Sequence, residues 1–107
     1  MAATPEKKVK DKVRKILNEA GAYHFMPATH GYGTSGVPDI VGCYKGRMFA
    51  IECKAGSNKP TALQMKNLAA IAAAGGYAEV INEENLLDVV ALLGRIDRDA
   101  QREHEHT

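Results

Sequence analysis

The chain has 107 residues, of which 45% are hydrophobic, and this length and composition fit one globular domain with a core of modest size. Its net charge is only +1, but residues 1–60 hold ten Lys and Arg against five Asp and Glu, whereas residues 61–107 hold four against eight. A basic half fits a surface that faces phosphates, although uneven charge is also common on proteins that never contact nucleic acid. No apolar run approaches the roughly 18 residues of a membrane span, and the N-terminus lacks the apolar stretch of a signal peptide, so we expect a soluble, cytoplasmic protein without a membrane partner.

Helical spacing of apolar residues predicts a first helix that begins near Pro5 and ends at Gly21. Its other face is rich in lysine, for which the simplest interpretation is a solvated surface and the alternative is a surface that faces DNA. Residues 22–28 are typical of a short strand. The glycine-rich stretch of residues 29–36 has no apolar periodicity and predicts a loop.

Two strand-like runs follow, over residues 40–44 and 47–54. The pair Lys45-Gly46 between them predicts a tight hairpin turn in which glycine supplies a positive φ.

The remaining elements complete a single α/β domain. They are a helix, a strand and a last helix with Asn82 as its cap, over residues 61–74, 77–81 and 83–93. The order α-β-β-β-α-β-α, with a helical crossover before the last strand, predicts a mixed central sheet flanked by helices. We therefore expect one domain over residues 1–95 and a charged, flexible tail over residues 96–107 that has nothing to bury.

The predicted hairpin brings two carboxylates together. If Lys45 and Gly46 form the turn, the numbers of residues paired across it add to 91, and Asp39 then faces Glu52. Directly opposed residues on one sheet face have Cβ atoms roughly 4.5–5.5 Å apart, so these carboxylates would repel each other unless a cation lay between them. Because hard oxygen ligands suit Mg²⁺ or Mn²⁺, the pairing predicts a divalent metal site.

A lysine completes a chemically meaningful set. Alternation along the second strand of the hairpin puts Glu52 and Lys54 on one face and apolar residues on the other. Phosphodiester hydrolysis needs a metal that polarises the phosphate and activates water, and a cation that orients this water or stabilises developing charge. The alternative is that Asp39 is a turn residue after Pro38 and that Glu52 and Lys54 are ordinary exposed positions. Their combination at one hairpin favours the catalytic interpretation.

The motif also resembles a known family. Pro-Asp at residues 38–39, followed by Glu-Cys-Lys at residues 52–54, resembles the PD-(D/E)XK signature of restriction enzymes and junction resolvases. With a first helix that contains Glu6 and a later helix that contains Gln64, the chain is similar over about residues 5–82 to the small stand-alone VRR-NUC nucleases of phages and bacteria.

The resemblance implies a restriction-endonuclease-like fold in which Asp39, Glu52 and Glu6 bind the metal. It also implies that Lys54 assists the attacking water and that Gln64 lines the site. The expected activity is that of a Mg²⁺- or Mn²⁺-dependent endonuclease that cleaves structured or branched DNA, such as a Holliday junction, in a bacterial or phage-infected cell. A four-way junction has two related cleavage sites, which a C₂ homodimer of so small a domain can address.

The glycine-rich loop also matches a nucleotide-binding pattern. The pattern Gly-x-Gly-x-x-Gly occurs at residues 31–36, but a dinucleotide site needs a helix there, whereas this stretch leads into a strand. We expect instead that the loop and a nearby lysine contact the nucleic-acid backbone, through Thr29, Tyr32, Thr34, Ser35 and Lys59. Two alternatives stay open: a catalytically silent nucleic-acid-binding module, and a nuclease that acts on RNA or linear duplex DNA.

Overall fold

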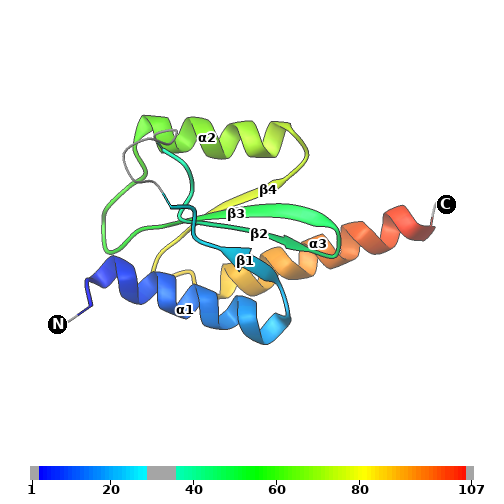
Figure 1. Cartoon of the computed structure of the whole chain (residues 1–107), viewed down its shortest axis with the longest axis horizontal. Helices are drawn as coiled ribbons and strands as arrows, with labels where there is room; N and C mark the ends of the chain where they lie inside the picture. Colours follow the sequence, from blue (N-terminus) through cyan, green and yellow to red (C-terminus); the bar gives the residue numbers. More distant parts are fainter. Residues whose placement is uncertain (1–2, 29–35, 106–107) are drawn as a thin grey trace.

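A mixed four-stranded sheet, with strands in the order β1-β2-β3-β4, forms the centre of the molecule (Figure 1). The computed structural model describes residues 3–28 and 36–105. Its elements are α1 (Pro5–Ala20), β1 (Tyr23–Phe25), β2 (Ile40–Tyr44), β3 (Arg47–Cys53), α2 (Ala62–Ala73), β4 (Tyr77–Ile81) and α3 (Leu87–Glu105). The predicted single α/β domain with the order α-β-β-β-α-β-α is therefore confirmed.

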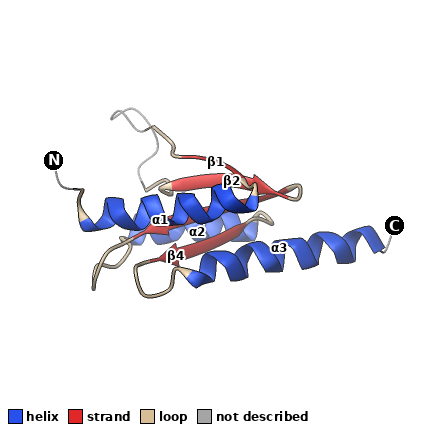
Figure 2. Cartoon of the chain, turned by 90° about the horizontal axis from the view of Figure 1, so that it is seen from below, coloured by secondary structure: helices blue, strands red, loops and turns tan. Residues whose placement is uncertain are grey.

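The helices cover the two faces of the sheet unequally. Helices α1 and α3 pack on one face and α2 on the other (Figures 1 and 2). Three alternate residues of β3, namely Phe49, Ile51 and Cys53, are fully buried in one core cluster with the apolar side chains of α1 and α3. Because side chains alternate along a strand, Glu52 lies on the opposite face, outside this apolar cluster.

The β2–β3 hairpin has the predicted register. The turn residues Lys45 and Gly46 have φ values of 52° and 80°, the two positive φ values that a two-residue type I′ turn requires. The ladder pairs Ile40 with Ile51 and Val41 with Ala50, so the numbers of paired residues add to 91 as predicted. Strand β4 pairs with β3 in parallel, which confirms the crossover through α2.

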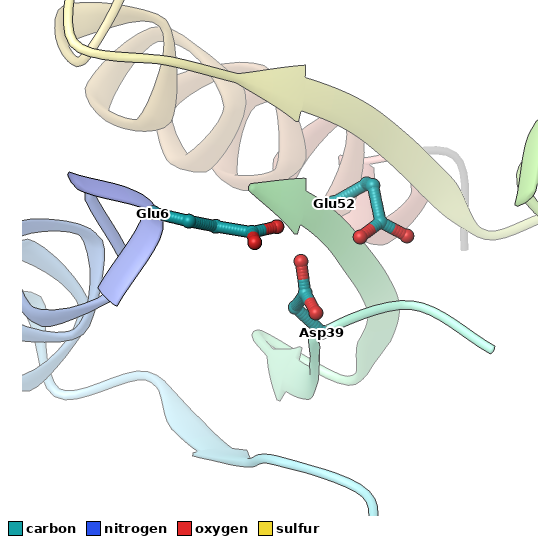
Figure 3. A group of neighbouring side chains, drawn as sticks. All are labelled: Glu6, Asp39 and Glu52. Carbon is teal, nitrogen blue, oxygen red and sulfur yellow. The ribbon is translucent and has the colours of Figure 1, made fainter. Parts of the chain in front are cut away.

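Helix α1 begins where the sequence predicts. The side-chain oxygen of Thr4 accepts a hydrogen bond from the backbone N–H of Lys7, and Pro5 occupies the first helical turn. Gly21 ends the helix with a left-handed φ of 76°. The N-terminal cap Thr4 places Glu6 in the first turn of α1, beside the end of the sheet where β2 begins and β3 ends (Figure 3).

The predicted boundaries of strand β1 and the predicted start of the last helix are wrong. Strand β1 spans only Tyr23–Phe25 instead of residues 22–28. The last helix begins at Leu87 instead of residue 83, because the side chain of Asn82 accepts from the backbone of Glu84 and forms a turn. Asparagine side chains that bond to nearby backbone compete with helix formation in this way.

The last helix also runs further than predicted, to Glu105 instead of residue 93. Ile96 is fully buried, and the hydroxyl of Tyr77 donates a hydrogen bond of 2.6 Å to Asp99, so this segment has contacts that local sequence does not reveal. The division into a domain of residues 1–95 and a flexible tail of residues 96–107 stays a prediction, and these contacts tie the described part of that tail to the sheet. Within residues 3–28 and 36–105, no helix has the length and apolarity that a membrane span requires.

The close packing of β2 on its neighbours gives a test of the fold. A Cβ atom at Gly42 would lie 2.3 Å from the carbonyl oxygen of Tyr23 and 2.4 Å from the ring of Phe49. We expect Gly42→Ala to lower the free energy of unfolding in urea by at least about 2 kcal/mol, because backbone cannot move aside for the methyl group. Gly94→Ala makes the same change inside α3 and should raise stability by about 0.5–1 kcal/mol. Equal stability of the two variants would contradict this packing.

Candidate functional site

Three carboxylates from distant parts of the chain converge at one end of the sheet. They belong to Glu6 in the first turn of α1, Asp39 immediately before β2, and Glu52 near the end of β3. One oxygen from each lies within 4.8 Å of the others, and Figure 3 shows the side chains pointing toward one another. This spacing is short enough for all three to contact a single cation.

Asp39 is oriented by the neighbouring strand. Its Oδ2 atom accepts a hydrogen bond of 2.8 Å from the backbone N–H of Cys53, and its Oδ1 atom lies 3.5 Å from the ammonium nitrogen of Lys10. The carboxylate therefore has one oxygen held by β3 and the other turned toward a positive charge. The preceding residue, Pro38, is buried and removes a backbone donor at this position.

Glu52 is a buried acid in an unfavourable environment. Only 1% of its surface is exposed, and in the described part of the chain its Oε2 atom has no hydrogen-bond partner. The pKa of Glu52 is raised from its ordinary value of 4.5 to about 8, mainly by burial, then by a hydrogen bond with Asp39 and by the negative charges of Asp39 and Glu6, while the charge of Lys54 lowers it. An unpaired buried polar oxygen costs free energy, and a cation bound at this position would remove that cost.

Two lysines, Lys54 and Lys10, lie near the carboxylates. Lys54 is half-buried directly after β3, where its backbone N–H bonds to the carbonyl of Ile81 at 3.0 Å, and its charge lowers the pKa of Glu52. Lys10 was interpreted from sequence as one of several solvated lysines of α1, yet it contacts Asp39. Its position four residues after Glu6, on the same face of the helix, is the signal that could have found it.

Gln64 and Lys59, the other predicted site residues that the structure describes, lie in α2 and in the loop before it. Gln64 forms a capping box at the start of α2: its Oε1 accepts from the backbone of Thr61 at 2.8 Å, and its own backbone N–H donates to the Thr61 hydroxyl at 3.2 Å. This capping occupies the side-chain oxygen of Gln64. Lys59 is exposed in the loop between β3 and α2. The four loop residues predicted to contact nucleic acid lie outside the described residues: Thr29, Tyr32, Thr34 and Ser35.

The donor set fits a hard divalent cation. All three ligand candidates offer carboxylate oxygens, which Mg²⁺ and Mn²⁺ prefer. The nearby thiol of Cys53 is not an additional ligand candidate, because burial raises its pKa to about 12 and keeps it protonated. The Oε2 atom of Glu52 is the observation that fits a bound cation best, since it is a buried oxygen for which the described residues supply no hydrogen-bond partner.

The protein is an α/β domain in which three carboxylates, with lysines near them, form a candidate metal site at the open end of a β-hairpin. No family model matches the chain. Over 86 residues, which are 79% of this chain and 86% of the relative, the sequence is 34% identical to a protein of Acyrthosiphon pisum secondary endosymbiont phage 1 named "Putative nuclease p44". The chain belongs to the same family as this phage protein.

Proposed function

We propose that the protein is a Mg²⁺- or Mn²⁺-dependent nuclease of the PD-(D/E)XK class, similar to the VRR-NUC nucleases, that hydrolyses phosphodiester bonds in DNA. The observation that supports it most is the convergence of three carboxylates within 4.8 Å, one of which, Glu52, is buried and has an Oε2 atom without a hydrogen-bond partner among the described residues. The name of the phage relative agrees with a nuclease. A relative from a phage also agrees with a role in the cytoplasm of a bacterial or phage-infected cell.

In this proposal Asp39, Glu52 and Glu6 hold the cation. A bound divalent cation polarises the phosphate and lowers the pKa of the attacking water. The protein's own part is to keep the ligands in place: β3 orients Asp39 through the Cys53 N–H, and the capped first turn of α1 presents Glu6. Preorganised ligands of this kind need no rearrangement at the moment of reaction.

Lys54 and Gln64 act beside these ligands in the proposal. The ammonium group of Lys54 orients the attacking water or stabilises charge that develops on the phosphate, and its electrostatic effect on Glu52 supports a position near the reacting groups. Gln64 lines the site with its amide group while its oxygen caps α2. Lys59 and the loop residues Thr29, Tyr32, Thr34 and Ser35 contact the nucleic-acid backbone.

The substrate we propose is structured or branched DNA, such as a Holliday junction, bound by a homodimer. Apolar side chains that remain exposed on α2 and on the edge strand β1 offer surfaces on which a second copy could pack. They include Leu63 and Met65, which are 44% and 49% exposed, and Tyr23 and Phe25, which are 71% and 49% exposed. Sedimentation of the purified chain tests the dimer.

A cleavage assay tests the proposed activity. Purified protein is incubated with labelled four-way junction, linear duplex, single-stranded DNA or RNA, in Mg²⁺, Mn²⁺ or EDTA. We expect cleavage in either metal, none in EDTA, and the highest rate on the junction. Lys54→Met should lower the cleavage rate about a hundredfold or more, because one donor at the reacting phosphate is lost. Lys66→Met, a matched change at an exposed lysine of α2, should leave it unchanged.

The same assay separates the alternatives. Cutting in EDTA, or a wild-type rate in Lys54→Met, would contradict the proposed mechanism. Binding without cutting in either metal favours a silent nucleic-acid-binding module. Faster cutting of RNA or of linear duplex than of the junction keeps the chemistry and replaces the substrate.

A further inference from the structure

Lys10 is the basic side chain of α1 that reaches the acidic centre. Its ammonium nitrogen lies 3.5 Å from Oδ1 of Asp39, and both side chains are largely buried, with 29% and 21% of their surfaces exposed. It follows Glu6 by one helical turn, so α1 presents a carboxylate and an ammonium group to the same cluster.

The two oxygens of Asp39 have different partners, and this difference matters for a cation. Oδ2 is engaged by the backbone N–H of Cys53 at 2.8 Å, a bond that belongs to the strand geometry and cannot easily be given up. Oδ1 lies 3.5 Å from the ammonium nitrogen of Lys10, so a cation that binds this oxygen has the ammonium group as its neighbour. A divalent cation at Oδ1 and the ammonium group of Lys10 would therefore repel each other at close range.

We propose that Lys10 is a built-in counter-ion that competes with the divalent cation for Asp39 and thereby sets the metal affinity of the site. The inference rests on the proposed function, because it assumes that the carboxylates bind a metal. In the metal-free protein the ammonium group balances Asp39. When a cation binds, the flexible four-carbon stem of Lys10 lets the ammonium group move away from Oδ1. Lys10 is a positioning residue in this account, acting through Asp39.

Measurements of metal binding without nucleic acid test this role separately from cleavage. Mn²⁺ is titrated calorimetrically into wild-type protein and Lys10→Met at about pH 9, above the pKa of Glu52 near 8. Methionine is unbranched and of similar length, and it removes the charge. We expect Lys10→Met to bind Mn²⁺ on the order of tenfold more tightly, as expected for removing one positive charge a few ångströms from a divalent ion. The Mn²⁺-induced rise in Tm should increase accordingly.

Matched variants make the result specific. Lys8→Met removes an exposed charge from the same helix and should bind Mn²⁺ like the wild type, and Lys10→Arg should do so because it keeps the charge. Lys10→Gln replaces the methionine variant if the latter does not fold. Equal or weaker Mn²⁺ binding by the neutral Lys10 variants, while Asp39→Asn abolishes it, would overturn the counter-ion role alone. If the wild type itself binds no Mn²⁺, the metal site and the role of Lys10 both fall.

Discussion

Replacing Asp39 by Asn is expected to lower the rate of phosphodiester cleavage by on the order of a thousandfold or more while the fold persists. The amide oxygen of Asn can still accept the hydrogen bond from the Cys53 N–H, which in the native protein measures 2.8 Å. A neutral amide, however, is a much weaker ligand for a hard cation than a carboxylate, and it leaves the nearby Lys10 without its counter-charge. The loss should therefore appear in metal affinity and in turnover, and not in stability.

Single-turnover cleavage rates, Mn²⁺ titration and thermal unfolding of the variant distinguish these effects. Asp11→Asn is the matched control, because it makes the same chemical change on α1 at an exposed residue that pairs with Lys7. It should change the cleavage rate by no more than about twofold, as is usual for exposed ion pairs. An Asp39→Asn variant that keeps more than about a tenth of the wild-type rate would exclude Asp39 as an essential ligand.

Glu52→Gln should make the metal-free protein more stable at alkaline pH. The folded protein holds the pKa of Glu52 near 8, whereas its ordinary value is 4.5. Between these values the folded state binds a proton that the unfolded state has released, so the stability of the wild type falls as pH rises from about 4.5 to about 8. Glutamine is neutral throughout and does not show this loss. Above the folded pKa the variant should exceed the wild type by a few kcal/mol, and the difference should shrink toward zero in acid.

Urea unfolding in EDTA across this pH range measures the effect. Glu84→Gln, at an exposed position in the turn before α3, should follow the wild type at every pH. Addition of Mn²⁺ at alkaline pH should make the wild type the more stable of the two proteins. A metal ion that binds only the folded state stabilises the wild type, whereas the variant has lost one of the carboxylates that bind it. Parallel pH profiles of wild type and Glu52→Gln would show that Glu52 is not a strained acid.

The burial of Glu52 also affects the stability of the metal-free domain. Glu52 occupies a position on β3 between the buried residues Ile51 and Cys53 and is itself 1% exposed. A buried acid whose charge is disfavoured is costly for folding unless a bound cation compensates it.

The sequence by itself determined the local geometry of the site. A two-residue turn with glycine leaves one register for the hairpin, and the period of two along a strand then decides which residues meet across it. That is why Asp39 and Glu52 could be brought together from residue numbers alone. The start of α1 at Pro5 was likewise predicted, and that of α2 to within one residue, because helix starts depend on local features such as proline in the first turn and the capping hydrogen bonds of Thr4 and Thr61.

Only the tertiary structure decided what surrounds this pair. The packing of α1 beside the sheet brings Glu6 and Lys10 to Asp39. The spacing of four residues puts Glu6 and Lys10 on one face of the helix, but it does not show what that face contacts. The same holds for the extent of α3, which depends on the burial of Ile96. The burial that shifts the pKa of Glu52 is likewise a property of packed layers. Turn and strand geometry act between near neighbours, whereas burial and charge proximity arise between segments far apart in the chain.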